Sequence, residues 1–96
     1  MELKFIQKYN STTKFPGHWG RVQRACPYEF KVTNVDGDEF SEWLKFIESI
    51  GQEYRDDDGG FGHWHVDNYD DYYYILLSHK VVTHPEFKAK VVELLV

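Results

Sequence analysis

The chain has 96 residues, of which 42% are hydrophobic and 18% aromatic, and it carries a formal net charge of -5. This composition excludes intrinsic disorder, and the length predicts one domain with one core over residues 1–96. The longest mainly apolar stretch, residues 72–77, is far below the roughly 20 residues that cross a bilayer, so we expect no membrane span and a cytoplasmic protein.

The first third of the chain predicts two strands separated by a long loop. Apolar and polar residues alternate over residues 2–9, which is typical of a strand. Turn-forming residues fill positions 10–20, and strand periodicity returns over residues 21–32. Pro27 lies within this second segment and predicts a bulge or a sheet edge there.

The middle of the chain predicts an amphipathic helix. Asp36 and Glu39 have the spacing of a capping box, and Gly51 predicts a left-handed stop. Between them, the apolar residues recur at helical intervals: Phe40, Trp43, Leu44, Ile47 and Ile50.

The last part of the chain predicts three strands and a second helix. The strands are expected over residues 52–55, 61–66 and 72–77, joined by turns rich in Asp, Asn and Gly. Thr83 and Glu86 form another capping-box pattern, with Pro85 in the first turn. The predicted fold class is α+β, with an antiparallel β-sheet of four to five strands and two helices packed on one face, in the order β-β-α-β-β-β-α.

Charge is divided unevenly along the sequence. Residues 1–32 carry six Lys or Arg against two acids, a net charge of +4, whereas residues 33–73 carry twelve acids against two basic residues, a net charge of -10. The division predicts two faces of opposite sign, unless the two halves neutralise each other across the sheet.

A short run of alternating residues is a candidate metal site. On a strand, His63, His65 and Asp67 would project from one face about 6 to 7 Å apart, and they are ligands for zinc or another divalent metal. This pattern makes a metal-binding protein or a small metal-dependent hydrolase one candidate function. The alternative is that the two histidines lie on the polar face of a strand whose other face, with Trp64 and Val66, enters the core.

Other catalytic patterns are absent from the sequence. There is no Gly-rich phosphate loop and no G-x-S-x-G or HExxH motif, so we predict a non-catalytic protein with no catalytic residue and no cofactor. Three aspartates at 56–58 precede two glycines but lack the spacing of a calcium loop, and they are typical of a hairpin turn. Cys26 is the single cysteine, which excludes an internal disulfide and predicts an inert, buried thiol.

The basic N-terminal segment makes a single-stranded RNA-binding module a second alternative. Basic and aromatic residues alternate there, as in grooves that hold single strands, although the pI near 5.4 opposes polyanion binding. The candidate nucleic-acid contacts are Lys14, His18, Trp19, Arg21 and Arg24.

The acidic and aromatic midsection favours a protein that acts by contact. Tyrosines bring large contact area at low entropic cost, and more of them gather here than one layer of a small core can bury. The predicted partner-binding residues are Tyr54, Asp56, Asp57, Asp58, Tyr69, Asp70, Asp71, Tyr72 and Tyr74. We expect an inhibitor or adaptor that docks on a basic protein partner, such as one that handles nucleic acid. In size and composition it resembles the small acidic inhibitors that phages encode as accessory or anti-defence proteins. The same tyrosines could instead cover the interface of a homodimer.

Overall fold

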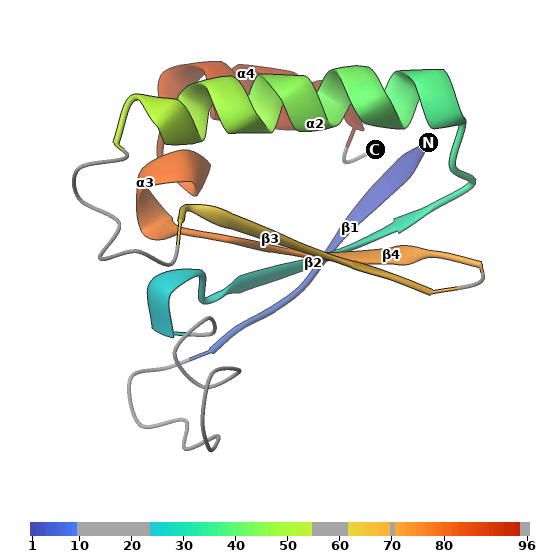
Figure 1. Ribbon diagram of the computed structural model, residues 1–96, viewed down its shortest axis with the longest axis horizontal. Coiled ribbons are helices and arrows are strands. Elements are labelled where there is room, and N and C mark those ends of the chain that lie inside the picture. Colours follow the sequence, from blue (N-terminus) through green and yellow to red (C-terminus); the bar gives the residue numbers. More distant parts are fainter. Residues whose placement is uncertain (10–23, 55–61, 70, 95–96) are drawn as a thin grey trace.

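The fold is a four-stranded antiparallel sheet with its two longer helices on one face (Figure 1). It is seen in a computed structural model, which describes residues 1–9, 24–54, 62–69 and 71–94. The strands are β1 (Glu2–Lys8), β2 (Tyr28–Thr33), β3 (Trp64–Asn68) and β4 (Tyr73–Leu77), in the sheet order β1-β2-β4-β3. The helices are α2 (Gly37–Gln52), α3 (His79–Val82) and α4 (Pro85–Leu94). The predicted α+β class is therefore confirmed.

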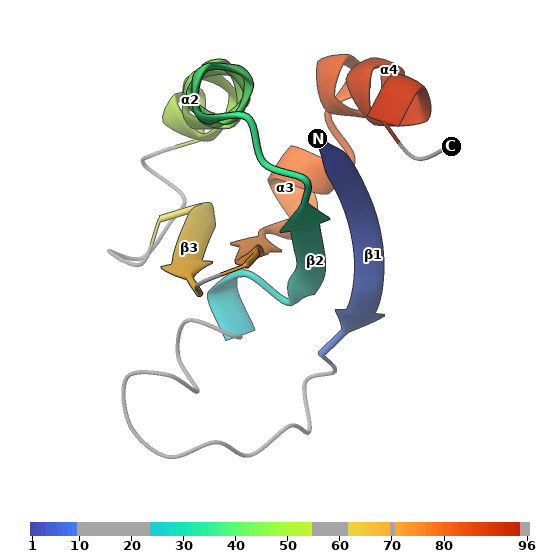
Figure 2. The same ribbon diagram turned by 90° about the vertical axis from the view of Figure 1, so that its right-hand side faces the viewer.

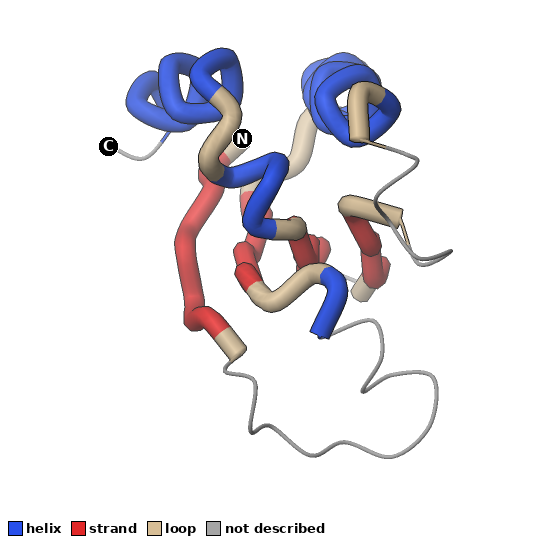
Figure 3. Tube along the Cα trace, turned by 90° about the vertical axis from the view of Figure 1, so that its left-hand side faces the viewer, coloured by secondary structure: helices blue, strands red, loops and turns tan. Residues whose placement is uncertain are grey.

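The two longer helices form a single layer over the sheet. When the sheet is viewed edge-on, α2 lies over the β3 side and α4 over the β1 side (Figure 2). The view from the opposite side shows the same separation, with α2 and α4 above the strands (Figure 3). Among the described residues, no helix is long and apolar enough to span a bilayer.

The core lies between this helix layer and the sheet because strand residues alternate between the two faces. On β2, Phe30 and Val32 point towards the helices, and on β4, Ile75 and Leu77 do the same. Among the described residues, the buried members of this main core cluster are Leu3, Phe30, Val32, Phe40, Trp43, Ile47, Ile50, Ile75, Leu77, Val81, Phe87 and Val91.

Helix α2 begins as predicted but ends differently. The Asp36 carboxylate accepts hydrogen bonds from the backbone N–H groups of Asp38 and Glu39, at 3.0 and 3.1 Å, so Asp36 is the N-cap. The left-handed stop expected at Gly51 is wrong, because this glycine is helical and buried. A Cβ at Gly51 would overlap the ring of Trp64, so packing against β3 requires a glycine here.

Two further predictions of local structure are wrong. The strand expected over residues 52–55 does not form, because α2 continues to Gln52 and a turn follows at residues 53 and 54. The second capping box is also not formed. Thr83, the C-cap of α3, instead donates its hydroxyl hydrogen bond to the carbonyl of His79. The backbone N–H of Glu86 donates to Nδ1 of His84.

The first strand is close to its predicted bounds, but the second is shorter than expected and the irregularity predicted for it lies in the first. The register of β1 on β2 shifts between Phe5 and Gln7, so the bulge lies in β1 and not at Pro27. Strand β2 is shorter than the predicted segment 21–32, since Arg24 and Ala25 have helical backbone and residues 21–23 lie outside the described part of the chain.

Candidate functional site

The face of the sheet opposite α2 and α4, which we call the open face, carries mostly polar and aromatic side chains. Antiparallel pairing aligns them in two rows that cross the strands. One row runs from Lys31 through Tyr74 to Asp67, and the other runs from Glu29 through Leu76 to His65. Each row therefore brings residues far apart in sequence next to one another.

Three tyrosines on the open face pack against one another, and we call them the tyrosine cluster: Tyr69, Tyr72 and Tyr74. Tyr69 stacks on Tyr72 at a centroid distance of 5.1 Å, and both rings meet Tyr74 edge-on, at 5.5 and 5.2 Å. The turn between β3 and β4 is closed by a hydrogen bond from the Tyr69 N–H to the Tyr72 carbonyl, which folds Tyr69 back over the strands. Tyr69 keeps 48% of its surface exposed.

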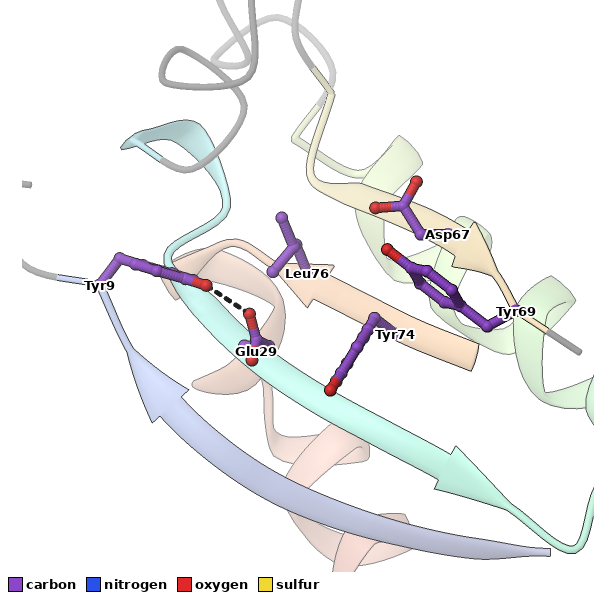
Figure 4. Close-up of a pocket in the computed structure, with 6 residues that line it drawn as sticks. All are labelled: Tyr9, Glu29, Asp67, Tyr69, Tyr74 and Leu76. Carbon is purple, nitrogen blue, oxygen red and sulfur yellow. Dashed lines mark hydrogen bonds between the residues drawn. The ribbon is translucent and has the colours of Figure 1, made fainter. Parts of the chain in front are cut away.

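A hollow of about 290 Å³ lies beside the tyrosine cluster on the open face. Its lining residues are Tyr9, Glu29, Asp67, Tyr69, Tyr74 and Leu76. Figure 4 shows Tyr9 and Glu29 on one side, Asp67 and Tyr69 on the other, and Leu76 and Tyr74 between them. The hollow thus combines an aliphatic floor, aromatic walls and two carboxylates.

Internal hydrogen bonds hold both carboxylates of the hollow in place. The Tyr9 hydroxyl donates to Glu29 Oε2 at 2.5 Å, and Gln7 Nε2 donates to the Tyr9 hydroxyl at 3.3 Å. On the other side, His65 Nε2 lies 3.2 Å from Asp67 Oδ1. These contacts hold the carboxylates of Glu29 and Asp67 in fixed positions.

The side chain of Lys31 contacts the tyrosine cluster. Lys31 Nζ lies 4.3 Å from the ring centroid of Tyr72, in the range of a cation–π interaction. The described lining of the hollow itself contains no lysine or arginine. Among the described residues of the open face, β2 therefore carries both Glu29 and Lys31, and β3 carries Asp67.

Cys26 is a fully buried thiol that packs against Leu76 of the open face. Together with Leu76 it forms a small cluster, flanked by Tyr9 and Ala25. Burial raises the pKa of the Cys26 thiol to about 12. Because the thiolate is the reactive species, the prediction of an inert thiol agrees with its surroundings.

The structure does not bring the three predicted metal ligands together. His65 and Asp67 are neighbours on β3, but His63 precedes the strand and is buried elsewhere. One nitrogen of its ring lies 2.9 Å from the Ser78 hydroxyl and the other 2.8 Å from the Tyr54 carbonyl oxygen. Within the described ranges, no group of three or more His, Cys, Asp or Glu side chains is placed to hold a metal ion.

The predicted partner-binding residues fall into three groups. Tyr69, Tyr72 and Tyr74 meet on the open face, and Asp71 is exposed in the adjoining turn. Asp56, Asp57, Asp58 and Asp70 lie outside the described residues.

Tyr54 belongs to the helix side, which corrects the expectation that it shares a surface with the other tyrosines. Its ring packs edge-on against His63 and His84, and it contacts the core cluster. Because α2 continues through residue 52, Tyr54 follows the helix and does not lie on a strand.

The predicted nucleic-acid contacts cannot be assembled into a surface. Lys14, His18, Trp19 and Arg21 lie outside the described residues, and Arg24 is exposed just before Cys26.

Sequence reasoning missed Tyr9, Glu29, Lys31 and Leu76, which border the site. The alternation in β2 placed Glu29 and Lys31 on one face, and this was the available signal. It could not reveal that β4 would lie between β2 and β3, which is what places Glu29 across the hollow from Asp67.

Two further hollows are less well equipped for specific recognition. One of about 630 Å³ lies among Phe5, Phe30 and Phe87 near α4, and its described lining has the single charged side chain of Lys88. The other, of about 650 Å³, lies at the β3–β4 turn beside Asp71 and Tyr72. Of these three hollows, each lined by described residues, the one beside the tyrosine cluster combines two carboxylates with aromatic walls.

No protein-family model, no curated protein and no solved structure matches this chain. The function is therefore argued from the open face itself.

Proposed function

We propose that this chain is a non-catalytic binding protein that docks, through its open face, on a basic surface of a protein partner. The observation that carries the proposal is the tyrosine cluster, which lies on the face of the sheet opposite the helix layer, with Asp67 beside it. Tyrosines are enriched at interface hot spots because a rigid ring buries much area for little entropic cost.

The chemistry of the open face supports a basic partner. Glu29 and Asp67 line one hollow from opposite sides, and exposed Asp71 lies next to Tyr72. Carboxylates at an interface attract positively charged partners, speed their encounter and select against acidic ones. Tyr rings next to these carboxylates add cation–π attraction for lysine and arginine.

An inhibitor or adaptor is the role that such a surface serves best. A protein that handles nucleic acid presents lysines and arginines to phosphates. A small acidic protein that occupies those side chains excludes the polyanion by direct competition. This is the mode of action that we propose, and it accords with the analogy to small acidic phage-encoded inhibitors.

Affinity capture from the cells that carry the gene tests this proposal. The bait would be the wild-type chain, compared with a Tyr69→Ser/Tyr74→Ser double variant of the open face. The matched control is Glu42→Gln/Glu48→Gln, which changes exposed side chains on α2, on the opposite side of the sheet. We expect a basic protein that the wild type and the control retain and the tyrosine variant loses.

A competition step identifies the kind of partner. If the captured protein handles nucleic acid, added single-stranded RNA should release it from the wild-type bait, and its retention should fall as salt is raised. Capture that is equal for all three baits, or lost only in the α2 control, would contradict docking through the open face. A stable dimer by light scattering, broken by the tyrosine variant alone, would instead assign the face to self-association.

A further inference from the structure

The hollow beside the tyrosine cluster has the dimensions of a site for one side chain. Its volume of about 290 Å³ is at the lower limit of the range for small-molecule pockets, which is about 300–1,000 Å³. It is therefore suited to the end of a long side chain and not to a cofactor. Its floor, Leu76, is apolar but only 2% exposed, so a bound side chain would contact mainly the rings of Tyr69 and Tyr74.

The walls of the hollow favour a cation. Tyr69 and Tyr74 are inclined at 84° to each other, so two ring planes meet nearly at right angles. A cation placed over a ring face is attracted by the negative charge of the π-system. Lys31 over Tyr72 shows that this cluster already attracts one cation, supplied by the chain itself.

The two carboxylates select the shape of that cation. Within the described chain, Tyr9 engages Oε2 of Glu29, and His65 engages Oδ1 of Asp67. No hydrogen bond from a described residue reaches Glu29 Oε1 or Asp67 Oδ2, so a ligand can use the second oxygen of each carboxylate. The two groups stand on opposite sides of Leu76 and Tyr74 (Figure 4), so a ligand that reaches both needs donors that point in divergent directions.

A guanidinium group meets these conditions better than an ammonium group. It is planar and stacks on aromatic rings, and its five N–H donors form a fixed fork that pairs with carboxylates. An ammonium is a compact, strongly hydrated charge, which loses more hydration on entering an aromatic hollow. A bare metal ion would need more ligands than the two carboxylates and one imidazole that the described residues place on this face.

We propose that the hollow binds the guanidinium group of a single arginine of the partner, stacked on Tyr74 and paired with Asp67 and Glu29. This inference rests on the proposed function, since it names the partner side chain that the open face receives. Charge complementarity decides the occupant: two carboxylates line the hollow, and its described lining supplies no cation.

The probe for this site is a capped tripeptide with arginine between two glycines, titrated into the full chain and followed by the NMR signals of the tyrosine rings. We expect saturable shifts at Tyr69 and Tyr74, with a dissociation constant on the order of millimolar. The citrulline analogue, which has the same shape without the charge, should give no saturable shift. The lysine analogue should bind roughly threefold or more weakly.

Isosteric variants locate the site. Asp67→Asn and Glu29→Gln should each weaken arginine binding by roughly three- to tenfold, because each removes one charge-assisted hydrogen bond. Asp38→Asn at the start of α2, which removes the same charge far from the open face, should leave binding unchanged. Thermal unfolding followed by circular dichroism confirms that each variant is folded.

The outcomes separate this inference from the proposed function. If the arginine peptide shifts no tyrosine ring, or if all variants bind it equally, the arginine site is wrong, even where capture of a basic partner depends on the tyrosines. If lysine and arginine peptides bind equally, the hollow recognises charge alone and the guanidinium assignment fails. If the peptide binds as expected but capture does not depend on the open face, the proposed function fails and the site stands.

Discussion

Two neighbouring residues on β4 show how differently the two faces of this sheet are used. The ring of Tyr73 stacks on Phe40 of α2 at a centroid distance of 4.2 Å and helps to close the core. Tyr74 points to the opposite face, where it contacts Tyr69 and Tyr72 and borders the hollow. The same residue type therefore serves stability at one position and display at the next, because a strand alternates its side chains.

The largest expected loss of stability that tests this comparison comes from replacing the next two residues on β4, Ile75 and Leu76. Ile75 is fully buried in the main core, whereas Leu76 is buried in the small cluster with Cys26. We expect Ile75→Ala to lower the free energy of unfolding by about 4 kcal/mol and Leu76→Ala by about 2 kcal/mol, near the two ends of the usual range. Urea denaturation of both variants measures the difference. Equal losses would show that the open face is packed as densely as the core.

A second test concerns the contact between α2 and the sheet. Gly51→Ala places a methyl group where the Trp64 ring lies, so we expect a loss of about 1 to 3 kcal/mol from overpacking, despite the better helix propensity of alanine. Gly37→Ala is the matched control, because a Cβ there meets nothing within 4 Å. That variant should stay within about 0.5 kcal/mol of the wild type. If Gly51→Ala is also neutral in urea denaturation, α2 and β3 do not pack this closely.

Gly51 also shows what the sequence could and could not predict. The period of the apolar residues and the Asp36 cap predicted the helix and its start correctly. A glycine after an apolar helical stripe usually marks the stop, but here it makes room for a tryptophan 13 positions later in the chain. The local sequence pattern specifies the helix, whereas the strand residue that packs against it, here Trp64, is determined by the whole fold.

The candidate site illustrates the same limit. Alternation predicted that Tyr72 and Tyr74 share a face, and the crowding of aromatics indicated that one face would be displayed. Alternation also suggested that His63 belongs with His65, but β3 begins one residue too late for that. Glu29 entered the site through strand order, which no local pattern in β2 records.

The buried thiol of Cys26 predicts that the free energy of unfolding depends on pH. Burial raises the pKa of the Cys26 thiol from its ordinary value near 9 to about 12. The unfolded chain therefore releases this proton at a lower pH than the folded chain, so this contribution to stability is complete below pH 9 and is lost as pH rises towards 12. The expected slope is about 1 kcal/mol per pH unit in that window.

Comparison with Cys26→Ala isolates this effect from the titration of tyrosines and lysines. The difference in unfolding free energy between the wild type and the variant should shrink steadily from pH 9 to pH 11. A constant difference over this range would mean that the thiol is hydrated in the folded state. Native Cys26 should also react slowly with a thiol reagent at pH 8, and fast once urea unfolds the chain.

The smallest expected effect concerns Tyr69, the most exposed member of the tyrosine cluster. Tyr69→Ala should change the unfolding free energy by no more than about 0.5 kcal/mol, because the ring is half in solvent and loses only its contacts with Tyr72 and Tyr74. Tyr73→Ala, four positions later, should cost about 2 kcal/mol, since its stacking on Phe40 is part of the core. Thermal or urea unfolding compares the two variants directly. A large loss for Tyr69→Ala would make the cluster a structural element of the sheet, whereas a near-neutral change leaves binding as the reason for these three rings to stand together.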